Sequence, residues 1–221
     1  MHDEEAAFYR KRLLLSIAIP GFLLILIWLA FAIEQLTGAD LKELGIFPQT
    51  LKGAPGILLS PFVHADIKHL FNNSIPLLVL GTALFYFYGE VSLKVFLLNW
   101  LFTGSMVWIA GRESWHIGAS GLVYGLVFFI FFSGIIRRHF RLMALSLLVV
   151  FLYGSMVWGM FPIVPVNISW ESHMLGAVSG IFLAVWYHNE GPQAPVYEWL
   201  DEEEEEDDID YDVSEDESDT R

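Results

Sequence analysis

The chain has 221 residues, of which 55% are hydrophobic and only 17% are charged, and its mean hydropathy is +0.50. Its net charge of −14 is concentrated at one end, because residues 198–221 hold fifteen of the twenty-six acidic residues and one of the twelve basic residues. The rest of the chain has no net charge and few charges of either sign, which excludes a soluble globular enzyme and a basic nucleic-acid-binding protein. The absence of cysteine excludes a disulfide framework, a thiol nucleophile and a cysteine-ligated metal.

Six apolar runs in the first 190 residues predict an all-α membrane protein with six transmembrane helices. A helix needs about 20 mostly apolar residues to cross the hydrocarbon core of a bilayer. The runs are residues 13–33, 70–88, 93–110, 120–136, 142–161 and 173–188. The first run follows a basic triplet, but it is too long for the apolar part of a signal peptide and has no small-residue cleavage site.

The basic residues that flank the runs predict that both termini are cytoplasmic. In this orientation the inner side holds seven basic residues and the outer side holds four, as the positive-inside rule requires. We expect a short cytoplasmic segment at 1–12, a membrane domain at 13–190, and an acidic, disordered cytoplasmic tail at 191–221. The compact body favours a bacterial inner membrane.

One long loop, residues 34–68, follows the first run. Its apolar residues are interrupted by glycines and by Pro48, Pro55 and Pro61, which prevents a further span. We therefore expect an outer loop that is partly embedded in the membrane interface.

Polar residues mark the beginnings of three spans, where they are costly and are functional candidates. His69 and Asn73 lie four residues apart on one helix face, Ser120 lies in a Gly-Ala-Ser-Gly sequence, and His173 opens the last run. Because even-numbered spans all run from outside to inside, these side chains are predicted to lie at one depth near the outer face.

This set supplies the parts of an acyl-transfer site. Ser120 would be the nucleophile, and His173 would take its proton as general base and return it to the leaving amine. The backbone N–H of Ser120 would face the developing oxyanion, with His69 and the Asn73 amide as further donors. No carboxylate lies in the three span openings, so the sequence favours a Ser-His dyad.

Small and aromatic residues beside these positions are expected to support the site. Gly121 and Gly125 on the fourth run, and Gly176 and Gly180 on the sixth, would let the two helices approach closely. Tyr124 lies one turn below the serine and could pack against the imidazole.

Each feature also has a structural explanation. A GxSG sequence alone is common in packed membrane helices, Tyr124 could be a core residue, and Asn73 could bond across helices. On a helix, His64 would point away from His69, so we interpret His64 as a structural hydrogen-bonding residue and expect no shared metal. No cofactor is expected.

At these residues the sequence resembles the rhomboid intramembrane serine proteases, over roughly Gly45 to His188. The resemblance rests on four separated motifs in order: Pro61-Phe-Val-His64, the HxxxN of His69 and Asn73, the GxSG of Gly118 to Gly121, and the HxxGxxxG of His173 to Gly180. It implies a six-helix rhomboid-type bundle with Ser120 as nucleophile and His173 as base. It also implies oxyanion donors from His69, Asn73 and the Ser120 backbone, and packing of Tyr124 against the base.

The resulting hypothesis is a serine endopeptidase that cleaves the transmembrane helices of membrane-protein substrates near their outer end. Its expected partners are these substrates and the lipid bilayer, with neither nucleic acid nor metal. The alternative is a non-catalytic rhomboid-like protein that binds client transmembrane helices. A transporter is a weaker alternative, because the spans lack buried acids.

Overall fold

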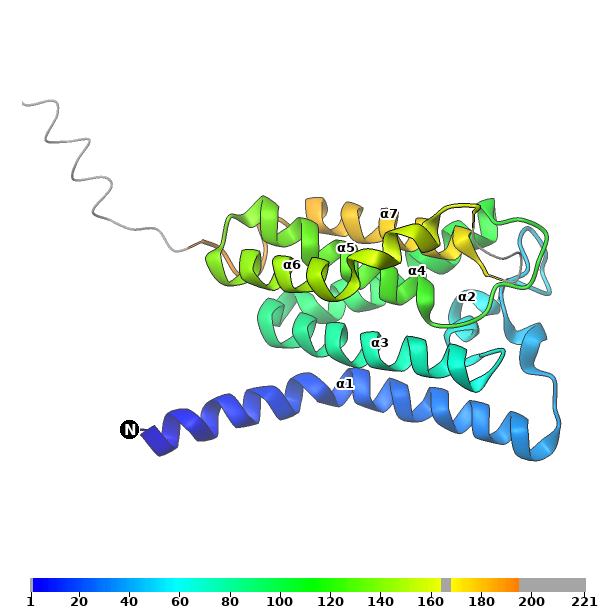
Figure 1. Ribbon diagram of the computed structural model, residues 1–221, viewed down its shortest axis with the longest axis horizontal. Helices are drawn as coiled ribbons and strands as arrows, with labels where there is room; N and C mark the ends of the chain where they lie inside the picture. The colour runs from blue at the N-terminus through cyan, green and yellow to red at the C-terminus, as the bar shows by residue number, and fades with distance from the viewer. Residues whose placement is uncertain (1, 164–167, 195–221) are drawn as a thin grey trace, which may run out of the picture.

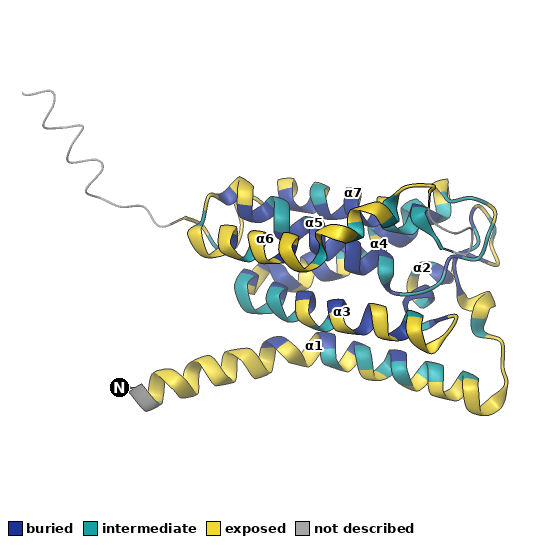
Figure 2. Cartoon of the chain, viewed as in Figure 1, coloured by how far each residue is buried: buried dark blue, intermediate teal, exposed yellow. Residues whose placement is uncertain are grey.

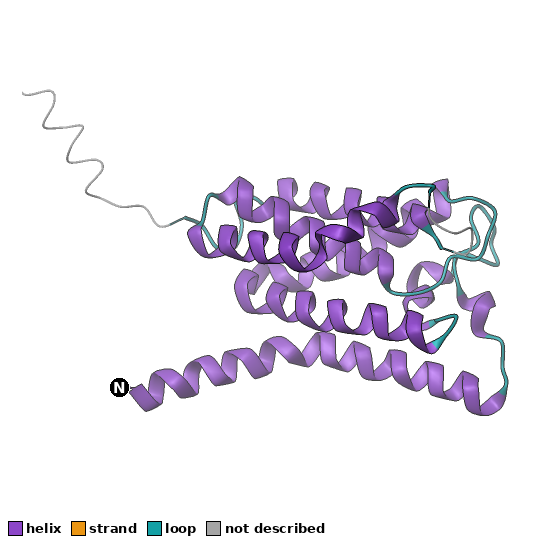
Figure 3. Ribbon diagram, viewed as in Figure 1, coloured by secondary structure: helices purple, strands orange, loops and turns teal. Residues whose placement is uncertain are grey.

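The computed structural model describes residues 2–163 and 168–194, and within these residues the fold is helical (Figures 1 and 3). The α-helices are α1 (His2–Thr37), α2 (Gly56–Leu59), α3 (Ile67–Tyr88), α4 (Ser92–Ala110), α5 (Ser120–Arg137), α6 (Phe140–Tyr153) and α7 (Trp170–Trp186). Short 3-10 helices lie between them: η1 (Leu41–Leu44), η2 (Ser60–Phe62), η3 (Gly89–Val91) and η4 (Gly154–Met160). The predicted tail lies outside the described residues from residue 195 onward.

Each predicted apolar run coincides with a helical segment, which makes the chain an all-α integral membrane protein. Among the described residues, four helical stretches are long and apolar enough to cross a membrane: Glu4–Thr37, Ile67–Ala110, Ser120–Arg137 and Phe140–Met160. The second stretch contains both α3 and α4, and α7 has 17 residues. The count of six spans therefore remains a prediction.

The long helices alternate in direction, so α3, α5 and α7 all begin at the end of the bundle opposite the N-terminus (Figure 1). Local sequence explains two of the helix boundaries. The Asp66 carboxylate accepts the backbone N–H of His69 at 2.8 Å and caps the start of α3. At the other end of the bundle, Gly89 has a φ of +48°, which lets the chain reverse into α4.

Helix α5 lies in the core of the bundle and packs on α7 through glycines (Figure 2). A Cβ atom on Gly176 would collide with the backbone carbonyl of Gly121, and one on Gly180 would collide with that of Gly125. The glycine pairs proposed from sequence thus face each other, and the two backbones are in direct contact. This close approach fixes where the first residues of α5 lie relative to α7.

At the opposite end of this helix pair, where α5 ends, Arg137 is buried. Its Nε donates to Ser133 Oγ at 2.8 Å, its Nη1 donates to the Pro192 carbonyl at 2.9 Å, and its guanidinium also bonds the Tyr187 carbonyl. Arg137 therefore ties the end of α5 to the residues at the carboxyl end of α7.

The loop between α1 and α3 packs on the segment that leads into α5. Ile46 and His116 form an isolated antiparallel bridge with N···O distances of 2.9 and 2.8 Å, and the Gly118 N–H donates to the Ser60 carbonyl at 2.9 Å. Leu51 and Leu58 are exposed on this loop. Its embedding in the membrane interface remains a prediction.

Candidate active site

Two side chains from different helices meet at the start of α5. The Ser120 hydroxyl and His173 Nε2 are 2.9 Å apart, although the residues are separated by 53 positions in the chain. Ser120 is the first residue of α5, so its backbone N–H belongs to the helix end that has no intrahelical partner. The structure therefore brings together a hydroxyl, an imidazole and a free backbone donor.

The second nitrogen of the His173 ring is held by a backbone carbonyl. Nδ1 lies 2.8 Å from the Gly159 oxygen in η4, and a carbonyl can only accept. The ring therefore carries its proton on Nδ1, and Nε2 presents a lone pair to the Ser120 hydroxyl. Sequence reasoning missed Gly159, because every residue has a carbonyl and nothing in the sequence marks this one.

Tyr124 lies against the same imidazole. The two rings are stacked with centroids 4.2 Å apart and planes within 6° of parallel, and the Tyr124 hydroxyl donates to the Met156 carbonyl at 2.7 Å. A Cβ atom on Gly159 would collide with Tyr124 Oη. Thus η4 supplies one carbonyl to the histidine and another to the tyrosine, and it can approach both only because residue 159 has no side chain.

His69 and Asn73 lie next to the loop that leads to Ser120. A Cβ atom on Gly118 would come within 2.7 Å of His69 Nε2 and 3.4 Å of Asn73 Nδ2, and Gly118 has a φ of +98°, so both space and conformation require glycine here. Asn73 is 6% exposed, and its amide nitrogen has no hydrogen-bond partner among the described residues. A buried donor without a partner is costly and suggests a role beyond packing.

His64 does not lie on the helix that carries His69, because α3 begins only at Ile67. The expectation that the two rings diverge was wrong for this reason: their centroids are 5.0 Å apart in an edge-on arrangement. His64 is buried, and burial lowers its pKa to about 4, with the neighbouring His69 acting in the same direction. Within the described residues, no three histidine, aspartate or glutamate side chains are grouped closely enough to hold a metal.

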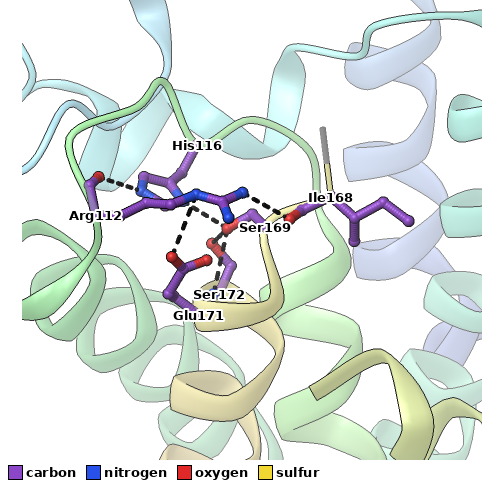
Figure 4. Close-up of polar contacts among 6 residues, drawn as sticks. All are labelled: Arg112, His116, Ile168, Ser169, Glu171 and Ser172. Carbon is purple, nitrogen blue, oxygen red and sulfur yellow. Dashed lines mark hydrogen bonds and ion pairs between the residues drawn. The ribbon is translucent and has the colours of Figure 1, made fainter. Parts of the chain in front are cut away.

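A second polar network joins the loop 111–119 to the start of α7 (Figure 4). The Arg112 guanidinium lies 3.3 Å from the buried Glu171 carboxylate and donates to the Ile168 carbonyl at 2.8 Å. The His116 ring contacts Ser169 Oγ at 2.5 Å and the Arg112 carbonyl at 3.0 Å.

Ser169 extends this network to the α7 backbone. It caps α7 by accepting the Ser172 N–H at 3.3 Å, and the two serine hydroxyls are 2.6 Å apart. The network thus fixes the loop that leads to Ser120 against the helix that carries His173.

The expectation that the span openings hold no carboxylate and that the spans lack buried acids was wrong at Glu171, which is 4% exposed in the first turn of α7. Because α7 begins at Trp170, Glu171 lies inside the last helix, two residues before His173. Its ion-pair partner is Arg112 rather than the histidine. The sequence does not predict this network, because Arg112 and His116 bond to residues more than fifty positions away in the chain, which helical spacing does not relate.

Comparison of the sequence with known proteins shows the family of this chain. The profile of the Rhomboid domain matches residues 54–190, and the chain belongs to the rhomboid family. An uncharacterized protein of Mycobacterium tuberculosis is 33% identical over 171 residues, which cover 72% of this chain and 70% of that protein. An uncharacterized protein of Mycobacterium leprae is 34% identical over 168 residues, covering 72% of this chain and 66% of that protein.

Proposed function

We propose that this protein is an intramembrane serine endopeptidase that cleaves transmembrane helices of membrane-protein substrates near their outer end. The observation that carries the proposal is the 2.9 Å contact between Ser120 Oγ and His173 Nε2, with Nδ1 held on the Gly159 carbonyl. This tautomer leaves Nε2 able to accept the serine proton, which is what a general base requires.

The first half of the reaction forms an acyl-enzyme. As Ser120 Oγ bonds to the scissile carbonyl carbon, its proton passes to His173 Nε2 and the carbonyl oxygen becomes an oxyanion. We assign the stabilisation of this oxyanion to the Ser120 N–H, to His69 and to the Asn73 amide, which has no other partner among the described residues. When the C–N bond breaks, the imidazolium gives its proton to the leaving amine, and the new amino terminus departs.

The second half repeats these steps with water. His173 takes a proton from water, the hydroxide attacks the acyl carbon, and the proton returns to Ser120 Oγ as the product acid leaves.

The substrate class follows from the place of the dyad in the bundle. The dyad lies at the end where α3, α5 and α7 begin, and we assign this end to the outer face of a bacterial inner membrane with both termini in the cytoplasm. A substrate helix has its carbonyls in hydrogen bonds, so it must unwind before attack. We therefore expect cleavage beside glycine or another weak helix former near the outer end of the substrate span.

The test is covalent labelling with a serine-directed fluorophosphonate in detergent. The parent is expected to label at Ser120, and labelling should disappear in Ser120→Ala and fall strongly in His173→Ala. Ser105→Ala removes a hydroxyl from the middle of α4 and is the matched control, which should label like the parent. A folded parent that does not label, or labelling that survives Ser120→Ala, would favour a non-catalytic protein that binds client helices.

A further inference from the structure

Helices α1 and α3 cross at one point and then separate. A Cβ atom on Gly81 would come within 2.7 Å of the Pro20 side chain, so the helices touch there. From this crossing toward the N-terminus, α1 diverges from the bundle, and its side chains are largely exposed (Figures 1 and 2). The divergence leaves a wedge between the first half of α1 and the end of α3.

This wedge contains a groove of about 580 Å³. Its apolar wall is formed by Phe8 and Leu15 of α1 and by Phe85 of α3. Its basic side chains are Lys11 and Arg12, both on α1. The turn into α4 contributes Ser92. An apolar groove with a basic rim, open at the side of a membrane protein, matches the two-part chemistry of a phospholipid.

Arg12 is held in place at this rim by the end of α3. Its Nη2 donates to the Tyr86 carbonyl at 2.6 Å, and its guanidinium carbon lies 4.7 Å from the centroid of the Tyr86 ring. A guanidinium has five N–H donors, so this contact leaves others for a ligand. Within the part of the chain that the structure describes, no carboxylate pairs with Lys11 or Arg12.

We propose that this groove, hereafter the α1–α3 groove, binds an anionic phospholipid. The lipid phosphate would lie on Lys11 and Arg12, and an acyl chain would lie along Phe8, Leu15 and Phe85. Two positive charges without a carboxylate partner favour an anionic headgroup over a zwitterionic one. The site is separate from Ser120 and His173, and lipid selectivity rather than proteolysis is its readout.

The test measures which lipid the full-length protein retains. The protein is reconstituted in nanodiscs that contain equal amounts of phosphatidylglycerol and phosphatidylcholine with identical acyl chains, and the lipids still bound after release are counted by native mass spectrometry. We expect the parent to retain phosphatidylglycerol with a preference of roughly tenfold to thirtyfold, the ratio that two basic side chains at a membrane surface should give.

Three variants separate the α1–α3 groove from general surface charge. Lys11→Gln/Arg12→Gln should lose the preference. Arg138→Gln/Arg141→Gln removes the same charge from exposed positions at the same end of the bundle and should keep it. Leu15→Trp keeps both charges but fills the groove, and it should also lose the preference. Thermal unfolding of each variant verifies that it is folded.

Several outcomes would overturn the proposal. One is a parent that shows no preference for phosphatidylglycerol, and another is an equal loss of the preference in Lys11→Gln/Arg12→Gln and Arg138→Gln/Arg141→Gln. An unchanged preference in Leu15→Trp would also contradict the proposal. Displacement of the lipid by excess inorganic phosphate would show a site for a free anion instead. If a preference for phosphatidylglycerol emerged only after deletion of residues 198–221, the acidic segment of the chain, and not a lipid, would be the occupant of the α1–α3 groove.

Discussion

The rings of Tyr124 and His173 lie face to face, 4.2 Å apart, and both residues are bonded to carbonyls of the same 3-10 helix, at Met156 and Gly159. One short segment, η4, therefore controls the orientation of the proposed base in two ways. It accepts the Nδ1 proton of the imidazole directly, and it holds the tyrosine ring that covers the imidazole face. In a serine protease triad a carboxylate has the first of these roles.

Replacing Gly159 by alanine should shift the imidazole of His173 while every proposed catalytic side chain is retained. The new methyl group would collide with Tyr124 Oη, so η4 must shift and the bond to His173 Nδ1 must weaken. We expect kcat to fall by about tenfold to a hundredfold in a cleavage assay with a transmembrane substrate, as for a misplaced catalytic group. Gly159→Ala/Tyr124→Phe removes the colliding hydroxyl and should recover part of the loss.

The matched control for this variant is Gly154→Ala, at the start of η4. A Cβ atom there would meet only a Val150 methyl group at 3.6 Å, an ordinary contact. Its kcat should equal that of the parent. An unaltered kcat in Gly159→Ala would show that η4 does not orient the base.

Asn73→Ala should slow turnover without abolishing it. The variant removes a buried, unpaired donor while the Ser120 N–H and His69 remain. Loss of one oxyanion donor costs about 10²–10³ in kcat when it is fully engaged, and less when other donors share the charge. Asn72→Ala changes the adjacent exposed amide and should be silent. Similar rates for the two variants would remove Asn73 from the oxyanion site.

The Arg112–Glu171 pair should contribute to stability more than an exposed pair does. Glu171 is buried, and Glu171→Gln removes the negative charge that lies 3.3 Å from the Arg112 guanidinium. Breaking a buried pair costs about 3–5 kcal/mol, and we expect about 1–3 kcal/mol here because the arginine is partly exposed. Denaturant unfolding in detergent measures this.

Glu43→Gln is the control for this measurement, because Glu43 pairs with Lys52 on the protein surface. Its cost should lie between about 0 and 1 kcal/mol. Equal effects of the two substitutions would mean that burial adds nothing to the Arg112–Glu171 interaction.

Folding stability should decrease below neutral pH because of two buried histidines outside the membrane spans. Burial lowers the pKa of His64 to about 4, and burial also lowers the pKa of His116. The unfolded chain takes up these protons near pH 6.5, so it binds more protons than the folded state between that pH and the lower folded-state pKa. The contribution of His64 is therefore complete above about pH 6.5 and is lost as the pH falls toward 4.

The measurement is the Tm as a function of pH for the parent and His64→Gln. The variant should show a smaller decrease in Tm between pH 6.5 and 4, while substitution of the exposed His188 should leave the parent curve unchanged. A steeper decrease in Tm in His64→Gln would show that protonation of His64 stabilises the folded state.

Local patterns in the sequence predict the helices and the position of the dyad, but not its supports. The lengths of the apolar runs predict where the helices lie along the chain. The alternation of span direction predicts that Ser120, His69 and His173 share one end of the bundle. The supporting contacts are of another kind: the Gly159 carbonyl has no side-chain signature, and the partners of Glu171 and His116 are set by tertiary packing. His64 was misplaced because a helical spacing was applied before the start of α3 at Ile67.

The measurement that tests the central claim most directly is cleavage of a purified transmembrane substrate in proteoliposomes by the parent and by folded Ser120→Ala, with the products located by mass spectrometry. The proposed mechanism requires the Ser120 hydroxyl, because it is the nucleophile that forms the acyl-enzyme and its proton passes to His173 Nε2. We predict a single cut near the outer end of the substrate helix by the parent and no detectable product from Ser120→Ala. Equal cleavage by the two proteins would contradict the assignment of Ser120 as the nucleophile.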